Sequence, residues 1–363
     1  MRQLETYEAI AELTRSLFPR EQLVSVQPLG PDTSRANIEK VGGYSLPLKL
    51  ALEGADGSQR YLVFRTATPN EFGHDRRSDR AQAMLLAYDT FGEVPNHVRA
   101  LDLGAIMEDG GLRSLRRSGE FYLLTSFAEG ILYSADLRRI AQRGLTDPLD
   151  EKRCRALSTY LVTLHSTRLS DGQTYRRAVR DLVGHGEGIF GIVDSYPNGV
   201  PAAPLSRLSQ IEEKCLTWRW RLRARDDRLR RTHGDFHPFN IVFGEGTQFT
   251  ALDASRGCRG DPADDVTAMA INYIFFALDT PGAWERGLGD LWRTFWSSYL
   301  ESSGDSQLLQ VAAPFLAWRG LVLANPRFYP GLSERARDSL LALVERALGV
   351  AEFDPAFAED IFR

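Results

Sequence analysis

The sequence predicts a bilobal α+β protein in which a β-rich lobe precedes a mostly helical lobe. Three observations lead to this fold class. The chain has 363 residues, more than one hydrophobic core usually serves. Its first third carries segments that alternate with the period of a strand, and the remainder carries helical patterns interrupted by one hairpin. We therefore expect a first lobe over residues 1–125, a hinge over 126–133 and a helical lobe over 134–363.

The composition is that of an ordinary folded protein, with 43% apolar and 25% charged residues. The formal net charge of −4 gives the chain no overall attraction to nucleic acid or to an anionic membrane. No apolar run approaches the ~20 residues of a membrane-spanning helix, and the amphipathic N-terminal segment does not resemble a signal peptide. Three scattered cysteines fit reduced thiols, so we expect a cytoplasmic protein.

The first lobe is predicted to begin with a helix and to continue with strands. Strand signals occupy residues 23–29, 45–52, 60–67 and 121–127, with a turn at Gly54–Ser58 between the second and third. Residues 74–91 have helical spacing. The second lobe opens its main series of helices at Asp147-Pro148, where Asp can cap free amides and Pro loses no hydrogen bond. Further helices are predicted over 207–228, 263–278, 284–301, 306–323 and 333–349.

The strongest chemical signal is the segment HGDFHPFN, which contains Asp235 and Asn240, followed by Asp253 after a predicted hairpin that turns at Gly244–Gly246. Phosphoryl transfer needs an acceptor hydroxyl held in line and phosphate charge neutralised by metal. Asp235 is the candidate base for the hydroxyl. Asn240 and Asp253 offer the amide and carboxylate oxygens that suit Mg²⁺, and the hairpin would return the chain so that both reach one ion.

HGDFHPFN, the following LDASRG and then GDPADDV resemble the aminoglycoside phosphotransferase family of small-molecule kinases, which has a protein-kinase-like fold. The resemblance implies an ATP-dependent or GTP-dependent, Mg²⁺-requiring enzyme. It would phosphorylate a hydroxyl of a small molecule such as an aminoglycoside-like antibiotic, an amino alcohol or a sugar metabolite. The same resemblance makes Asp235 the base, gives Mg²⁺ to Asn240 and Asp253, and assigns Asp265 to bracing the catalytic loop. His233 is expected to support that loop as a packed residue.

The resemblance also implies a cation on the third strand that holds the nucleotide phosphates. The family usually has Lys there, whereas this chain has Arg65, which keeps the charge and can bind phosphate through a bidentate fork. Lys49 is the second choice. The acidic partner on the following helix stays open between Asp79 and the position nearer the expected register, Gln82.

Two further groups are expected to contact the nucleotide. Backbone groups of Ser126 and Phe127 in the hinge would bind the adenine edge, and a phosphate-covering loop would offer Gly30, Thr33 and Ser34. The acceptor pocket is expected to draw on segments 292–300 and 315–330 of the C-terminal helices. Its candidate side chains are His237, Asp264, Trp296 and Trp318.

Two other functions remain open. His233, Asp235 and His237 form an HxDxH string, which on a strand would share one face and could hold the transition metal of a hydrolase. A nucleotide-binding pseudokinase is the other alternative, because Arg65 replaces the usual Lys; the intact Asp235, Asn240 and Asp253 argue against it.

Two motifs are interpreted as structural. The GxGxxG string at 186–191 lacks a preceding strand, so we expect a junction between helices rather than a dinucleotide site. The arginine-rich stretch at 219–231 is interleaved with acids, which favours a solvated helix face over a nucleic-acid interface.

Overall fold

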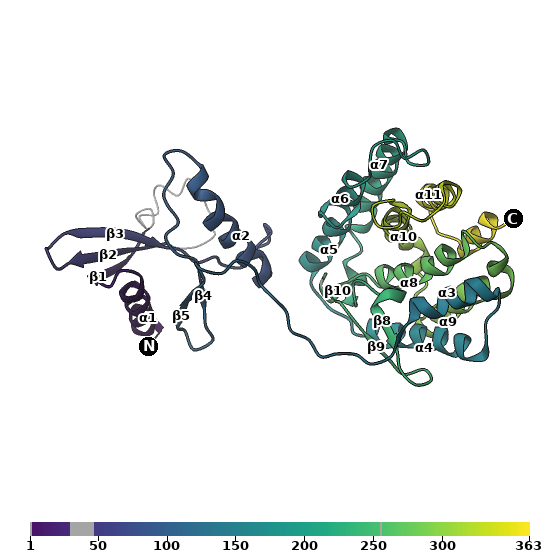
Figure 1. Ribbon diagram of the computed structural model, residues 1–363, viewed down its shortest axis with the longest axis horizontal. Coiled ribbons are helices and arrows are strands. Elements are labelled where there is room, and N and C mark those ends of the chain that lie inside the picture. The colour runs from purple at the N-terminus through teal and green to yellow at the C-terminus, as the bar shows by residue number, and fades with distance from the viewer. Residues whose placement is uncertain (1, 30–46, 255) are drawn as a thin grey trace. The chain divides into compact units, whose positions relative to one another are not determined.

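The computed structural model describes residues 2–29, 47–254 and 256–363, and the chain divides into two compact units, residues 1–125 and 126–363. Each unit is drawn in Figure 1 with its elements labelled. The helices of the first unit are α1 (Arg2–Leu17), α2 (Arg77–Thr90) and the 3₁₀ turn Phe91–Glu93. Its strands are β1 (Glu21–Pro28), β2 (Leu48–Gly54), β3 (Gln59–Phe64), β4 (Gly104–Ile106) and β5 (Leu112–Ser114).

The first unit is built on an antiparallel sheet in the order β1-β2-β3, with α1 packed beside it. Ile10 of α1 joins Leu23, Leu50 and Leu52 in a small core. These leucines face the helix because alternate side chains of a strand point to one side. The predicted strands at 23–29, 45–52 and 60–67 and the helix at 74–91 are thus confirmed where the structure describes them.

The strand predicted over residues 121–127 is wrong. The segment has no regular structure, and β4 and β5 just before it pair only with each other. Its apolar and aromatic residues suggested a strand, but a strand also needs a neighbour to take its backbone hydrogen bonds. Within the described residues no strand ladder includes this segment.

The second unit contains most of the described helices and five short strands. Its helices are α3 (Tyr133–Arg143), α4 (Pro148–His165), α5 (Gly172–Gly184), α6 (Ile189–Asp194), α7 (Leu205–Leu222), α8 (Pro262–Ala277), α9 (Gly289–Ser303), α10 (Leu308–Ala324) and α11 (Glu334–Gly349). A π-helix spans Trp284–Leu288, and 3₁₀ turns span Asp226–Arg228, Pro238–Asn240 and Pro355–Ile361. The strands are β6 (Ile131–Leu132), β7 (Arg230–Arg231), β8 (Ile241–Phe243), β9 (Phe249–Ala251) and β10 (Arg259–Gly260).

One continuous hydrophobic core holds this unit together, and α8 and α10 lie inside it. Both helices are apolar on nearly every side, as expected for buried helices. None of the helices among the described residues is long and apolar enough to cross a membrane. The predicted hairpin is confirmed: β8 pairs with β9, and β6 adds a third strand on the other edge of β8.

The start of α8 places two acids beside the loop that precedes β8. Asp261 caps the helix by accepting from the amide of Ala263, and Pro262 occupies the first turn, where its missing N–H costs nothing. Asp261 also takes a bidentate pair from Arg228, with both N–O distances 2.8 Å. Arg228 is therefore buried rather than part of a solvated face, which corrects the prediction for this one arginine of the 219–231 stretch.

The GxGxxG string lies between α5, which ends at Gly184, and α6, which begins at Ile189. It is a junction between two helices, as predicted.

Candidate active site

The segment between β7 and β8 carries His233 and Asp235 in irregular backbone and Asn240 at the end of the 3₁₀ turn Pro238–Asn240. Gly234 has φ of +84°, and a Cβ there would lie 2.7 Å from the carbonyl oxygen of Gly257. Only glycine combines that backbone conformation with so close a neighbour. The HxDxH string lies outside any strand, so its three side chains do not share a strand face.

Asp265, in the first turn of α8, holds this loop through its backbone. Its two carboxylate oxygens accept from the amides of His233, at 2.7 Å, and Gly234, at 2.8 Å. The carboxylate is fully buried. Burial alone would raise the pKa of Asp265, but the hydrogen bond and charge of His165 and the two amides lower it below its ordinary value. Asp265 therefore stays ionised, as an acceptor of three hydrogen bonds must.

His165 at the end of α4 continues this network to α9. Its Nε2 lies 3.1 Å from Asp265, and its Nδ1 lies 2.7 Å from the hydroxyl of Tyr299. Nε2 of the ring donates to the carboxylate, and Nδ1 shares a hydrogen bond with the Tyr299 hydroxyl. Side chains from three helices, α4, α8 and α9, thus form one hydrogen-bonded network that holds the Asp265 carboxylate in place.

The Asp235 carboxylate is partly buried, and neighbouring side chains contact both of its oxygens. Oδ1 accepts from Nη1 of Arg319, in α10, at 2.6 Å. Oδ2 accepts from Nδ2 of Asn240 at 3.1 Å, and Nε2 of His237 lies 3.4 Å from it. Nδ1 of His237 accepts from the amide of Phe239, so the proton of the neutral ring belongs on Nε2, facing Asp235.

These contacts set the charge of Asp235. Burial by itself would raise its pKa, but the hydrogen bond from His237 and the charge of Arg319 outweigh burial and hold the pKa well below its ordinary value. Asp235 is consequently an anion throughout the physiological range. It is suited to orienting a hydroxyl by accepting its hydrogen bond, and it is a weak base until that hydroxyl begins to lose its proton.

The hairpin β8–β9 brings Asn240 and the segment before Asp253 together. Ile241 pairs with Ala251, and the amide of Leu252 donates to the carbonyl of Asn240 at 2.8 Å. Asp253 has φ of +51°, an uncommon conformation for a residue other than glycine, and one that Asp tolerates better than most. Such strain is often kept where it aims a functional side chain.

This pair fits Mg²⁺ in its donor chemistry. Asn240 uses its side-chain nitrogen for Asp235, and its amide oxygen is the atom it can offer a cation. Asp253, which follows the Leu252 that bonds to Asn240, adds one carboxylate. Mg²⁺ prefers oxygen ligands and commonly takes only one or two from the protein, with water and phosphate completing its shell.

The residues of the HxDxH string do not form a set of ligands for a transition metal. His233 is buried, with its Nδ1 accepting from the amide of Asp235 at 3.3 Å, and it stacks edge-on against Phe236. The described part of the chain contains no group of three or more His, Cys, Asp and Glu side chains able to hold a metal ion.

Two arginines and a tryptophan stand beside Asp235. The guanidinium carbons of Arg256 and Arg319 lie 3.9 and 3.8 Å from the ring centroid of Trp318. Both arginines also approach Asp264, at 3.4 and 3.3 Å. Trp318 is itself buried, and its indole N–H donates to the carbonyl of Glu187, which fixes the ring. Of the four candidate acceptor residues, the structure brings His237, Asp264 and Trp318 together around Asp235.

Trp296, the fourth candidate, lies elsewhere. It is buried in the core with its ring against Trp292 and Phe353. Segment 292–300, which contains it, belongs to α9 and supplies mainly core residues. Packing is the role that these contacts describe for Trp296.

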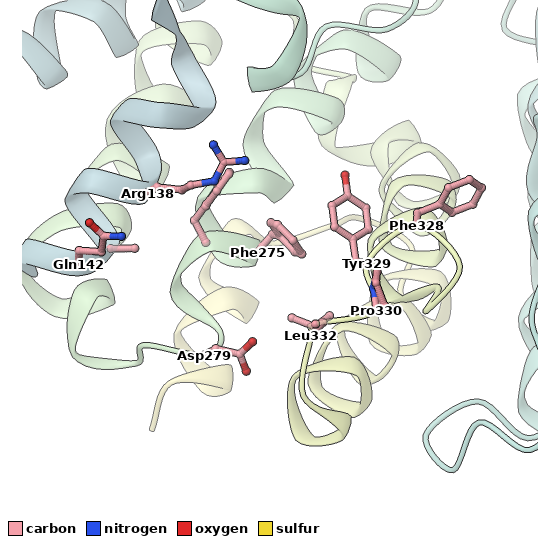
Figure 2. Close-up of a pocket in the computed structure, with 11 residues that line it drawn as sticks. Arg138, Gln142, Phe275, Asp279, Phe328, Tyr329, Pro330 and Leu332 are labelled. Atoms are coloured by element: carbon pink, nitrogen blue, oxygen red, sulfur yellow. The ribbon is translucent and has the colours of Figure 1, made fainter.

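A cavity of about 440 Å³ opens between α3, α8 and the loop that follows α10. Figure 2 shows Arg138 and Gln142 on one side, Phe275 on the floor, and Tyr329 and Phe328 on the other side. Tyr329 lies within electrostatic reach of Asp235: burial raises its pKa most, and Asp235 raises it further against the charges of Arg319 and Arg138. The predicted segment 315–330 thus contributes both to this aromatic cavity and to the arginine cluster.

The two candidate phosphate cations belong to the first unit. Lys49 lies in β2 opposite Val63 of β3, on the face away from Leu50 and Leu52, and Arg65 directly follows Phe64, the last residue of β3. Asp79 caps α2 by accepting from the amide of Arg76 at 2.8 Å.

Other nucleotide-side predictions cannot be placed in the same way. Gly30, Thr33 and Ser34 lie outside the described residues. Ser126 and Phe127 are in irregular backbone at the start of the second unit.

Sequence reasoning missed Arg319, Arg256, His165 and Tyr299. Arg319 did leave a signal, because it is the one charged residue in the apolar run FLAWRGLVLA, and a charge inside a buried helix needs a partner. Nothing in the sequence said that the partner is Asp235, 84 residues earlier.

Residues 51–298 match the model of the phosphotransferase enzyme family. Among solved structures, a glucosamine kinase bound to glucosamine, ADP and inorganic phosphate is 14% identical, covers 93% of this chain and 98% of its own, and gives a TM-score of 0.41. A choline kinase from Streptococcus pneumoniae is 13% identical, with 98% and 95% covered and a TM-score of 0.29.

A macrolide 2'-phosphotransferase is 14% identical, with 95% and 97% covered and a TM-score of 0.31. TM-scores this low give no basis for inferring the acceptor. No curated protein matches the sequence.

Proposed function

The chain belongs to the phosphotransferase enzyme family, with its protein-kinase-like fold and small-molecule phosphotransferase activity, and on that premise we propose that Asp235, Asn240 and Asp253 carry the transfer of a nucleotide γ-phosphate to an alcohol. The observation that supports the proposal most is the Asp235 carboxylate. It is ionised, fixed by Arg319 and Asn240, and seated on a loop held by Asp265. Phosphoryl transfer depends mainly on positioning and charge, which this arrangement supplies.

In the reaction we propose, an acceptor hydroxyl donates to Asp235 and is aligned with the γ-phosphorus of ATP or GTP. A bond forms between the hydroxyl oxygen and phosphorus, the bond from phosphorus to the β,γ-bridging oxygen breaks, and the proton passes to Asp235 as the nucleoside diphosphate leaves. Because the pKa of Asp235 is held low, this proton transfer follows the loss of the P–O bond rather than leading it.

Asn240 and Asp253 are the residues that would hold Mg²⁺, which when bound supplies positive charge to the phosphate oxygens. Arg65, with Lys49 as the alternative, is proposed to hold the phosphates from the sheet of the first unit. The aromatic cavity beside Tyr329 is proposed to receive the body of the acceptor. It is lined by groups that stack well on ring-shaped molecules, and Tyr329 follows α10, the helix whose Arg319 contacts Asp235.

Replacing Asp235 with Asn tests the proposal. The substitution keeps the shape of the side chain and removes its negative charge. ADP formation with Mg²⁺·ATP and a panel of alcohols should therefore fall by about 10²–10⁴-fold. Nucleotide affinity, measured by calorimetry, should change little.

Two results would contradict this assignment. Unreduced turnover in Asp235→Asn would remove Asp235 from the chemistry. Nucleotide binding by the wild-type protein without turnover of any alcohol would instead favour the pseudokinase.

A further inference from the structure

Arg256 and Arg319 meet the catalytic carboxylate on the side opposite Asn240. Oδ2 of Asp235 faces Asn240 and His237, whereas Oδ1 faces the two arginines, at 2.6 Å for Arg319 and 3.8 Å for Arg256. The nucleotide phosphates belong with the proposed cation ligands, on the Asn240 side. The arginine side of Asp235 is therefore the side from which an acceptor would be held.

The donors of Arg256 are poorly used within the protein. Its contacts run through Nη2, at 3.4 and 3.5 Å to Asp264 and 3.8 Å to Asp235. Charge-assisted pairs are normally about 2.7–2.9 Å long. Arg228 shows that this fold makes such pairs when an arginine is structural, since it binds Asp261 through two bonds of 2.8 Å. Arg256 lacks that geometry.

Two buried donors near Asp235 also lack partners. Within the described part of the chain, Nε of Arg256 and Nε of Arg319 are both buried without a hydrogen bond. Arg319 as a whole is only 7% exposed. A buried N–H left unpaired is costly, and native proteins usually keep one only where another group completes it.

The counter-charge available to these arginines is also incomplete. Asp235 must serve the acceptor hydroxyl, and burial raises the pKa of Asp264 against the opposing pull of Arg256 and Arg319. Among the described residues, Asp235 and Asp264 are the carboxylates that lie within 4 Å of these two guanidinium groups, and both arginines share them. Trp318 holds their planes by stacking, which restricts their rotation without using any N–H group.

On the basis of the proposed function, we infer that the acceptor carries an oxyanion, a carboxylate or a phosphate, close to its reacting hydroxyl, and that Arg256 with Arg319 binds it. Arginine is the residue that recognises such groups through a planar pair of donors. This assigns the protein to hydroxy acids or phosphorylated alcohols within the broad acceptor range of its family, and away from polycationic acceptors.

A matched set of sugars tests the inference by binding. Glucose is neutral, glucosamine is cationic, glucuronate has a carboxylate and glucose 6-phosphate has a phosphate. Each is titrated calorimetrically into the full-length protein saturated with Mg²⁺ and a non-hydrolysable ATP analogue, so that the nucleotide phosphate site is occupied. Inorganic phosphate and sulfate serve as minimal probes. We expect one oxyanion sugar to bind at least about tenfold more tightly than glucose and glucosamine.

Variants locate the effect. Arg256→Gln should abolish the oxyanion preference, and Arg256→Lys should keep part of it because the charge remains. Arg155→Gln is the control, since Arg155 is exposed and, within the described part of the chain, its side chain pairs with Glu151 in the preceding turn of α4. Circular dichroism and thermal melting establish that each variant is folded. The titrations with glucuronate and with glucose 6-phosphate decide whether the site takes a carboxylate or a phosphate.

Equal binding of all four sugars, a preference for glucosamine, no binding of any oxyanion, or an oxyanion preference that survives Arg256→Gln would each overturn the inference. The proposed function is judged separately, by Mg²⁺-dependent ADP formation with all four sugars. Turnover of glucose or glucosamine without an oxyanion preference would leave the phosphotransferase standing and remove only the acceptor class.

Discussion

Nη1 of Arg319 lies 2.6 Å from Oδ1 of Asp235 and ties the catalytic loop to the middle of α10. The contact joins a largely buried cation to the carboxylate that we propose orients the acceptor hydroxyl. Removing either partner would leave the other with an uncompensated charge in a partly desolvated place. The pair therefore sets both the position of Asp235 and its protonation state.

This pair has a consequence for pH dependence. The folded-state pKa of Asp235 lies below its ordinary value, so the ionised form is present from neutral pH down through that value. We expect the kcat/KM of the wild-type protein to show no acid limb from Asp235 between about pH 5 and 8. In Arg319→Gln the lost charge raises the pKa of Asp235, and an acid limb should move toward neutrality.

Arg319→Lys, which restores a charge, should reverse most of that movement. A wild-type and an Arg319→Gln profile that superimpose after scaling would show that Arg319 does not control the protonation of Asp235.

Asp253→Asn separates backbone conformation from charge. Asn tolerates a positive φ nearly as well as Asp does, so the φ of +51° should be kept and the protein should remain folded. The lost carboxylate should raise the Mg²⁺ concentration that gives half-maximal activity by at least about tenfold. Activity measured across a Mg²⁺ titration checks this.

Asn240→Ala is expected to act in the same direction. An unchanged Mg²⁺ requirement in both variants would exclude these residues as ligands.

Asp265→Asn should both destabilise the protein and displace the loop that contains His233 and Gly234. The amide cannot accept from His233, Gly234 and His165 as the buried carboxylate does, and breaking such a pair costs about 3–5 kcal/mol. Urea unfolding measures this loss. Asp290→Asn is the matched control, because Asp290 forms an exposed pair with Arg293 worth about 0–1 kcal/mol.

The sign of the accompanying pH effect is fixed by the lowered pKa of Asp265. Its contribution to stability is complete above the ordinary carboxyl value of 3.8 and is lost as the pH falls through the lower folded-state value. The difference in stability between wild type and Asp265→Asn should therefore shrink in strong acid. A difference that grows there would contradict the assigned charge.

Gly234→Ala should damage the loop more than a comparable change elsewhere. A positive φ costs an alanine about 1–2 kcal/mol, and at Gly234 the new Cβ would also meet the Gly257 carbonyl oxygen. Gly246 has φ of +61° with open space around it, so Gly246→Ala should pay only the conformational cost. Thermal melting compares the two, and equal losses would mean that the close approach to Gly257 is relieved without cost.

Sequence reasoning succeeded where the relevant contacts are local. The spacing from Asp235 to Asn240 and the hairpin before Asp253 lie within one short stretch, so the pattern of residues carries the geometry with it. Helix starts such as Asp147-Pro148 are equally local, and the structure shows Asp147 accepting from the amides of Leu149 and Asp150.

It failed where the outcome depends on distant partners. The apolar and aromatic pattern of residues 121–127 could not reveal that none of the described strands pairs with them. The contact of Arg319 with Asp235 joins a helix to a loop, and that of His165 with Asp265 joins two helices; both pairs are far apart in the chain, and no local pattern encodes them. The stacking of two arginines on Trp318 likewise appears only once α10 has packed.

The hydroxyl of Tyr299 is two hydrogen bonds away from the carboxylate that seats the catalytic loop. We therefore expect a change at Tyr299 in α9 to displace the His233 and Gly234 amides, which Asp265 holds. Redesigning this part of the interior for stability is then expected to change turnover at the proposed site as well.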